Sequence, residues 1–333
     1  PRSSQIAPED LLRKGDKMAL NQKVRIRSTG SHVPKNILTN EDLEKMVETK
    51  SSWIYENLGI KERRICSKDE LTSDLAAKAA DAAILSANID KNEIDLILLA
   101  TATPDRKAPS TACIVKNKLG ITNSCPAFDI SAVCSGFLYA MTLASHLIES
   151  GAYSRALVIG ADTFSQITDW NRRDCVFFGD GAGAAILEKS KDPIANFFSE
   201  ILSLTFETDN FTVFPDQRHF SMNGRAVYDT GIKVLPETIL SVLNHNSLTT
   251  KDITWIIPHQ PSIQILRKTA QVLEIPFQKI CTNMDRYANT SGATIPLLLD
   301  EVHRKGIFKR GDKIIFAAVG SGWAWGAALY VWH

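Results

Sequence analysis

The 333-residue sequence lacks the features that would place it in a membrane or outside the cell. No apolar run approaches the roughly 20 residues that a membrane-spanning helix needs, and no signal peptide opens the chain. Its six cysteines show no Cys-x-x-Cys spacing and form no dense disulfide framework. We therefore expect reduced thiols and a cytoplasmic protein.

A surplus of charge of either sign is also missing. The chain has 38 Lys and Arg residues against 37 Asp and Glu residues, a net charge of +1. This balance gives no electrostatic reason to expect binding to nucleic acid or to a membrane surface. With 44% hydrophobic residues, the chain can bury the core of one large domain or of two closely packed ones. The polar opening, residues 1–20, is predicted to be an extension or a cloning remnant outside that core.

What the sequence does contain is an alternation of apolar strands and helices. Continuous apolar runs, typical of strands buried on both faces, occur at 94–100, 156–160 and 184–187. Helices are expected between them, such as those at 110–119 and 136–150. This order predicts an α/β protein.

The pattern of the first part of the chain recurs in the second part. Two pairs of segments match, 92–101 with 251–259 and 151–160 with 309–318. We therefore predict two similar halves, residues 21–190 and 191–333, each with a central sheet and stacked on the other. The interface between two such halves is a common place for a ligand site.

Cys134 has the most informative surroundings of any residue in the chain. A short buried strand is expected at 126–130, and apolar residues from Phe137 to Ile148 follow at helical spacing. Cys134 therefore lies where a strand turns into a helix, beside backbone N–H groups without helical partners. The positive end of a helix favours the thiolate over the thiol, so we predict a nucleophile. The alternative is a buried core cysteine.

Two residues of the second half are candidate partners for Cys134. His259 follows the apolar run 253–257, and Asn289 lies in the small-residue turn 287–293. A single His or Asn in such a place is more often structural. Cys, His and Asn together, in these positions, indicate covalent acyl chemistry on sulfur.

Several stretches, in order and correctly spaced, make the chain from about residue 23 to 332 resemble a β-ketoacyl-acyl-carrier-protein synthase III of the thiolase-like superfamily. The matching stretches are 53–54 with 59–64, 131–137, 178–184, 258–260, 289–291 and 320–326. The resemblance implies a homodimer of five-layered αβαβα subunits. It also implies acyl-CoA and a malonyl thioester as substrates, an acyl carrier protein as a candidate partner, and no metal or redox cofactor.

The resemblance further implies a role for each candidate residue. An acyl group would transfer to Cys134, with the tetrahedral oxyanion held by the backbone N–H groups of Cys134 and Ser321. Decarboxylation of the malonyl thioester would leave an enolate that accepts hydrogen bonds from His259 and Asn289. Its attack on the acyl-cysteine would give a 3-oxoacyl product.

Two residues resemble the family's clamp on the adenine of CoA. Trp53 would stack on one face of the adenine and Arg172 on the other, by stacking and cation–π contact. The alternatives are a helix-packing aromatic for Trp53 and a solvated basic pair for Arg172 and Arg173.

Departures from the family pattern concern the substrates. Ala108 stands where a bulky Phe commonly forms the floor of the acyl pocket, contributed across the dimer. We therefore predict a starter longer than acetyl, unless Phe211 or Phe214 refills the space. The family's basic positions for docking the acidic carrier protein are replaced here by Asp229, Gln264, Gln271 and Val272. Weak docking of a standard carrier and a preference for malonyl-CoA or a dedicated carrier are expected.

Other functions fit the sequence less well. A papain-like cysteine hydrolase shares the order Cys, His, Asn, but places its cysteine in a different sequence context near the mature N-terminus. A non-catalytic acyl-binding subunit would have lost the nucleophile. Within the condensing enzymes, initiation of fatty acid synthesis and a specialised pathway of secondary metabolism both stay open.

Overall fold

The computed structural model describes residues 22–203, 208–213 and 219–333. The predicted extension, residues 1–20, and Phe214 lie outside the described residues. The strands are β1 Val24–His32, β2 Asn36–Thr39, β3 Glu62–Ile65, β4 Leu96–Ala100, β5 Ala127–Ile130, β6 Arg155–Thr163, β7 Asp180–Lys189, β8 Phe197–Ser203, β9 Phe211–Thr212, β10 Ser221–Met222, β11 Trp255–Pro258, β12 Lys313–Gly320 and β13 Ala324–Val331. The helices are α1 Asn40–Glu44, α2 Ser51–Leu58, α3 Thr72–Ala87, α4 Thr111–Leu119, α5 Gly136–Glu149, α6 Gly224–His245, α7 Ile263–Val272, α8 Met284–Tyr287 and α9 Thr294–Arg304. Short 3₁₀ turns are η1 Lys91–Glu93, η2 Val133–Ser135, η3 Phe164–Ile167, η4 Arg173–Val176, η5 Thr208–Asn210, η6 Thr250–Asp252, η7 Phe277–Lys279 and η8 Ser291–Ala293.

Two sheets form the framework. The first has the order β1-β7-β6-β4-β5, in which β4 runs parallel to β5 and β6. The second has the order β11-β12-β13-β8, in which β11 and β12 are parallel. Every strand of the first sheet precedes residue 190, and every strand of the second follows residue 191.

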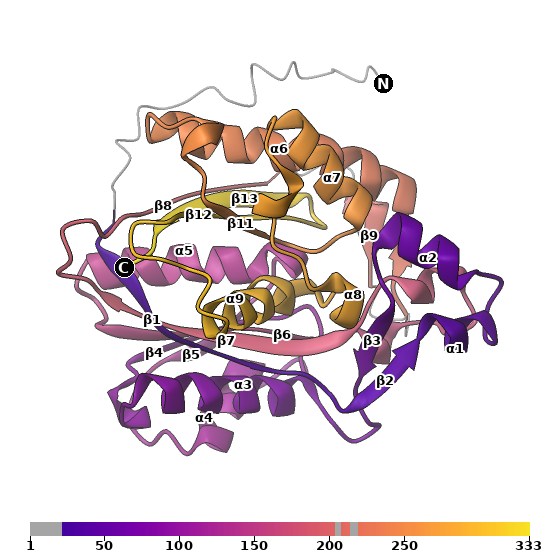
Figure 1. Ribbon diagram of the computed structural model, residues 1–333. Coiled ribbons are helices and arrows are strands. Elements are labelled where there is room, and N and C mark those ends of the chain that lie inside the picture. The colour runs from indigo at the N-terminus through magenta and orange to yellow at the C-terminus, as the bar shows by residue number, and fades with distance from the viewer. Residues whose placement is uncertain (1–21, 204–207, 214–218) are drawn as a thin grey trace, which may run out of the picture.

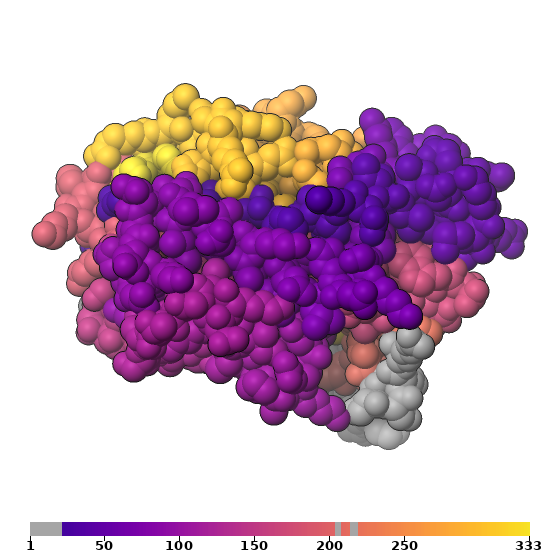
Figure 2. Space-filling view, turned by 90° about the horizontal axis from the view of Figure 1, so that it is seen from below, coloured from indigo at the N-terminus to yellow at the C-terminus, as the bar shows by residue number. Residues whose placement is uncertain are grey.

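The elements stack in five layers. From bottom to top in Figure 1 these are α3 and α4, the first sheet, α5 and α9, the second sheet, and α6 with α7. Figure 2 looks onto the outer layer of α3 and α4, with α1 and α2 projecting at one side. The α/β class and the five-layer αβαβα arrangement expected from the sequence are thus confirmed.

The middle layer is the hydrophobic centre of the molecule. Side chains of α5 and α9 pack against both sheets and are almost fully buried, among them Phe137, Leu138, Met141, Leu298 and Leu299. Each large apolar side chain buried in this way contributes about 1.5–3 kcal/mol. The apolar periodicity that predicted the helix after Cys134 therefore reflects burial between two sheets.

Glycines bring the first sheet unusually close to the start of α9. A Cβ atom on Gly160 of β6 would lie 2.1 Å from the carbonyl oxygen of Gly292. A Cβ atom on Gly183 of β7 would lie 2.5 Å from the backbone of Pro296 and Leu297. Backbone therefore rests on backbone, which only glycine permits. This contact packs the turn that contains Asn289 directly against β6.

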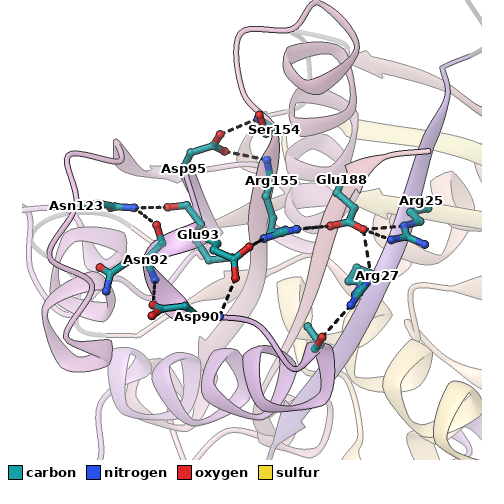
Figure 3. Close-up of polar contacts among 12 residues, drawn as sticks. Arg25, Arg27, Asp90, Asn92, Glu93, Asp95, Asn123, Ser154, Arg155 and Glu188 are labelled. Atoms are coloured by element: carbon teal, nitrogen blue, oxygen red, sulfur yellow. Dashed lines mark hydrogen bonds and ion pairs between the residues drawn. The ribbon is translucent and has the colours of Figure 1, made fainter. Parts of the chain in front are cut away.

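An ionic cluster closes the opposite end of the first sheet (Figure 3). Glu188, at the end of β7, accepts hydrogen bonds from Arg25 of β1 at 2.7 Å and from Arg155 at the start of β6 at 2.9 Å. Arg155 also pairs with Glu93 at 2.6 Å, and the Asp95 carboxylate accepts the backbone N–H of Arg155 at 2.9 Å. The parallel strands begin at this cluster, so their carboxyl ends, where ligands bind in open α/β sheets, point to the other side.

Candidate active site

Cys134 lies in the tight turn η2, immediately before α5. Val133 adopts a φ of 45°, a left-handed conformation that is strained for a β-branched residue. The Ser135 N–H donates to the Ala132 carbonyl at 3.0 Å and closes the turn. Such strain is typical of functional sites. The turn presents Cys134 to a cavity at the carboxyl ends of β4, β5 and β6.

The cavity that opens over Cys134 has a volume of about 1020 Å³, its mouth included. His259 and Asn289 also line it, so the structure brings together the three residues that the sequence proposes as catalytic. Most of its other walls are apolar, with Phe164, Phe178 and Val319 among them. A largely apolar chamber that also holds a cysteine, a histidine and an amide suits an acyl chain attached to a reacting group.

The amide of Asn289 is fixed in one orientation. Its Oδ1 accepts the backbone N–H of Ser291 at 2.8 Å. Its own backbone is tied to the first half, because the N–H donates to Phe177 O at 3.2 Å and the carbonyl accepts from Gly179 N at 3.0 Å. With Oδ1 engaged, the Nδ2 group is the end of the amide that can act in the cavity, and it is a donor.

His259 follows β11 and is held by its backbone N–H, which donates to Ala317 O at 2.8 Å. The residue is 1% exposed, and this burial lowers its pKa to about 3. The imidazole is therefore neutral at physiological pH. Among the described residues, Nδ1 is enclosed and has no hydrogen-bond partner. Nε2 is the nitrogen left to meet a ligand in the cavity.

Burial also governs the thiol of Cys134. The residue faces the cavity, but protein surrounds its sulfur, and this desolvation raises the pKa of the thiol to about 12. The Asp162 carboxylate raises that pKa further, while a hydrogen bond with Ser291 lowers it. Desolvation thus opposes the effect of the helix start and favours the neutral thiol, and the nucleophilic role of Cys134 stays a prediction.

Gly320 and Ser321 bring the second sheet to the nucleophile. A Cβ atom on Gly320 would lie 3.1 Å from the backbone nitrogens of both Cys134 and Ser135, so the end of β12 packs directly on η2. The Ser321 hydroxyl donates to Phe211 O at 2.9 Å and is occupied there. The backbone N–H of Ser321, and not its hydroxyl, is thus the group that could bind an oxyanion, as the sequence interpretation requires. The oxyanion hole formed by the N–H groups of Cys134 and Ser321 stays a prediction.

Comparisons with known proteins agree with this geometry. The C-terminal part of the chain, residues 243–332, matches the family model described as 3-oxoacyl-[acyl-carrier-protein (ACP)] synthase III C terminal, and residues 128–209 match the model of 3-oxoacyl-[acyl-carrier-protein (ACP)] synthase III. A beta-ketoacyl-[acyl-carrier-protein] synthase III of Thiobacillus denitrificans is 44% identical over 314 residues, which cover 92% of this chain and 98% of the relative. The chain belongs to the 3-oxoacyl-[acyl-carrier-protein] synthase III family. It is accordingly an acyltransferase of the condensing type.

Solved structures of a synthase III and of a priming β-ketosynthase have the same fold. The 3-oxoacyl-[acyl-carrier-protein] synthase III of Aquifex aeolicus superposes with a TM-score of 0.90 at 40% identity and covers 93% of this chain and 100% of its own. A priming β-ketosynthase of the R1128 polyketide pathway gives a TM-score of 0.87 at 25% identity, covering 96% of this chain and 99% of its own.

Arg173, the neighbour of the predicted clamp residue Arg172, lies over the ring of Trp53 in this structure. Trp53 is 36% exposed at the cavity mouth, and the guanidinium of Arg173 lies over its ring, 4.4 Å from the centroid. Arg172 is instead paired with Asp174 at 2.7 Å. The structure thus brings Arg173, and not Arg172, to Trp53. The contribution of Arg172 to CoA binding stays a prediction.

The acyl-pocket residue of the prediction is not part of the cavity within one chain. Ala108 is exposed in the loop between β4 and α4, and the walls near the nucleophile come from other residues. Phe211 is one of them, stacked on Phe220 with ring centroids 5.4 Å apart. An aromatic therefore does line this cavity. The role of Ala108 rests on a partner subunit and stays a prediction.

Two polar residues beside the nucleophile escaped the sequence interpretation. The Cys134 Sγ donates to the Ser291 hydroxyl at 3.7 Å, and the N–H of Gly292 donates to the Asp162 carboxylate at 2.8 Å. Ser291 follows Asn289 by two positions in a turn already singled out. Asp162 is an acid at the carboxyl end of a buried strand, which is a signal that the sequence does carry.

Neither a membrane span nor a metal cluster occurs in the part of the chain that the structure describes. No helix there is long and apolar enough to cross a bilayer. No group of three or more His, Cys, Asp and Glu side chains there is placed to hold a metal ion.

Proposed function

We propose that this chain catalyses the decarboxylative Claisen condensation of an acyl-CoA starter with a malonyl thioester, through an acyl group on Cys134. One observation carries the proposal: a cysteine, a neutral histidine and an amide fixed as a donor line the same apolar cavity. The cysteine is the acyl acceptor, and the other two are hydrogen-bond donors for an enolate oxygen. Each step uses groups of this chain and the CoA thioesters, so the proposal includes no metal or redox cofactor.

Mass spectrometry tests the covalent step. Protein incubated with octanoyl-CoA should gain one octanoyl group on a peptide that contains Cys134, and malonyl-CoA should then remove it as a 3-oxoacyl thioester. Cys113 is the matched control, because it is also a free thiol but is exposed and away from the cavity. Acylation of Cys113→Ala but not of Cys134→Ala is expected. An adduct elsewhere, or none, would reject this function.

We further propose that malonyl-CoA, or a carrier other than the standard fatty-acid carrier, is the better acceptor. Asp229 on α6 is exposed and is neutralised by Arg225 at 2.8 Å, and the Gln264 side chain at the cavity mouth donates to Glu56 O at 2.8 Å. These positions offer no cation of their own to an acidic carrier, although Arg267 and Lys268 are exposed on the neighbouring turn of α7. The test is kcat/KM for malonyl-CoA and for malonyl-carrier protein at two salt concentrations. A strong preference for the carrier that weakens with salt contradicts the proposal.

A homodimer in the cytoplasm is part of the same proposal. β5 is the outermost strand of the first sheet, and its Phe128 is 39% exposed. An exposed edge strand with a large apolar side chain is a ready surface for pairing with a second copy. α4, which packs on β4 and β5, follows the loop that carries Ala108. Light scattering coupled to gel filtration tests the dimer, and a monomer would also remove the basis for a pocket role of Ala108.

Two pathways are compatible with the proposed reaction. Those at 44% identity are named beta-ketoacyl-[acyl-carrier-protein] synthase III, which favours initiation of an acyl chain for fatty acid synthesis. The altered docking positions favour a specialised pathway. Measuring acceptor preference, as above, decides between the two.

A further inference from the structure

The resting state of Cys134 poses a chemical problem. Acyl transfer to sulfur requires a thiolate, yet burial raises the pKa of this thiol to about 12. His259 lines the same cavity as a neutral imidazole, and in the proposed reaction it must keep the proton that it donates to the enolate. Another group must therefore take the thiol proton.

Ser291 is the polar side chain that contacts the sulfur. The Cys134 Sγ–H donates to the Ser291 Oγ at 3.7 Å, an ordinary distance for a sulfur donor. Ser291 is fully buried and has a φ of 51°, the left-handed conformation. Two bonds hold it there: its N–H donates to Asn289 Oδ1, and the next N–H, of Gly292, donates to Asp162 Oδ2, each at 2.8 Å. The hydroxyl is thus a fixed part of the site.

Asp162 lies directly behind Ser291. It is fully buried at the end of β6, and a side-chain hydrogen bond with Ser291 is one of the contacts that lower the pKa of its carboxyl. Its Oδ1 accepts from the N–H of Ala102 at 2.7 Å and from the hydroxyls of Thr101 and Thr103 at 3.1 and 3.0 Å.

Asp162 is a buried acid without a cation. Among the described residues, no Lys, Arg or His forms an ion pair with it. Its charge raises the pKa of the nearby Cys134 thiol. Desolvation raises its pKa to about 6 in spite of the hydrogen bonds that lower it. A buried carboxylate without a cation is costly for stability and is typical of a functional group.

We propose that Ser291 and Asp162 form a proton relay for Cys134, in which Ser291 is a catalytic residue and Asp162 a positioning residue that holds the proton. The relay rests on the proposed function, since it deepens the acyl-transfer step. As the thiolate forms, the S–H bond breaks and its proton passes to Ser291 Oγ, while the proton of Ser291 passes to Asp162. A thiolate, a neutral hydroxyl and a carboxylic acid result.

Both half-reactions then balance. In acyl transfer, the thiolate electron pair forms the bond to the acyl carbon. The bond from that carbon to the CoA sulfur breaks, and its electron pair leaves on CoA. The CoA thiolate then takes a proton from solvent. In condensation, the enolate carbon attacks the acyl group and the electron pair of the acyl–Sγ bond returns to Cys134. The proton held by Asp162 returns through Ser291 and restores the thiol. The sum consumes one solvent proton and releases CO2 and CoA, as the condensation requires.

The test is the pH dependence of acylation, measured by quenched-flow mass spectrometry of the Cys134 adduct with octanoyl-CoA. In the wild-type protein the acylation rate should fall as the pH drops below about 6, because Asp162 must be ionised to accept the proton. Ser291→Ala keeps Cβ and the backbone but removes the hydroxyl. Because a general base contributes about 10²–10⁴-fold, we expect acylation at pH 7 to slow by about 100-fold. The decrease of the acylation rate at low pH (the acid limb of the profile) should disappear in this variant. Its acylation rate should instead rise steadily toward high pH.

Ser145→Ala is the matched control, since Ser145 is also fully buried and its hydroxyl donates to Thr142 O at 2.8 Å within α5. It should acylate at the wild-type rate. Asp162→Asn should lose the acid limb as well, and its thermal melting temperature shows whether this variant folds. If it does not fold, the result for Ser291→Ala alone tests the relay. A wild-type rate in Ser291→Ala, or an unchanged acid limb, overturns the relay. Failure of the wild-type protein to form any Cys134 adduct would instead reject the proposed function.

Discussion

Replacing Asn289 by Asp changes only the Nδ2 end of the side chain. The structure gives the two ends of this amide different roles. Oδ1 accepts the Ser291 N–H at 2.8 Å, and an aspartate oxygen can accept the same bond. The Nδ2 donor, however, becomes a second acceptor. The turn should therefore keep its conformation while the proposed enolate site loses a donor and gains a negative charge beside it.

The expected loss is large and specific to one step. Removal of one donor from an oxyanion-type site costs about 10²–10³ in rate, or about 2.7–4 kcal/mol. Asn289 is 6% exposed, so burial should raise the pKa of the new carboxyl above its ordinary value of about 3.9. The protonated carboxylic acid regains a donor, and condensation by Asn289→Asp should therefore recover as the pH falls. Asn289→Ala has no such group, so it should be slow at every pH.

Single-turnover measurements separate the steps. Acyl-enzyme is prepared with octanoyl-CoA and mixed with malonyl-CoA, and the release of 3-oxodecanoyl-CoA is followed between pH 5 and 8. Near-normal acylation with condensation slowed about 100-fold or more at pH 7.5 is expected for both variants. Condensation by Asn289→Asp at the wild-type rate at pH 7.5 would show that Nδ2 is not an enolate donor.

Three further outcomes follow from the same site. Cys134→Ala should lose acyl transfer entirely and still decarboxylate malonyl-CoA, measured as CO2 release; full condensation by this variant would contradict the covalent mechanism. The imidazole signals of His259, assigned by NMR with His259→Gln, should not titrate between pH 5 and 8, because burial lowers the pKa to about 3; a titration near pH 6.5 would remove its role as a neutral donor. If Ala108 leaves room in the acyl pocket, kcat/KM should rise from acetyl-CoA to octanoyl-CoA by up to about fourfold for each buried CH2, since each contributes about 0.8 kcal/mol, and Ala108→Phe should reverse the order. A preference for acetyl-CoA in the unaltered protein would instead indicate that Phe211 closes the pocket.

Much of the framework could be predicted from local patterns. Apolar runs at 94–100, 156–160 and 184–187 correspond to β4, β6 and β7, because strands buried on both faces need apolar side chains at every position. The helix after Cys134 is α5, whose apolar spacing reflects its place between two sheets. These features depend on neighbours in sequence, so a single sequence reveals them.

What escaped prediction depends on packing between distant segments. The protonation state of Cys134 is set by the atoms that surround the sulfur, and these come from both halves. Asp162 and Gly292 are hydrogen-bonded although they lie 130 residues apart, so no local pattern links them. The contact of Arg173 with Trp53 likewise joins residues that no local pattern links, whereas Arg172 forms an ion pair with its near neighbour Asp174.

The contact of bare backbone at Gly160 and Gly183 has a consequence for substrate traffic. At Gly160 and Gly183 no side chain lies between the first sheet and the start of α9. The two halves therefore lack a layer of deformable side chains along which they could slide past each other. The proposed thioester would then have to reach Cys134 past Trp53 and Tyr228, which line the same cavity. Substitutions at these two residues should change how fast the product leaves and leave the acyl-transfer step itself unchanged.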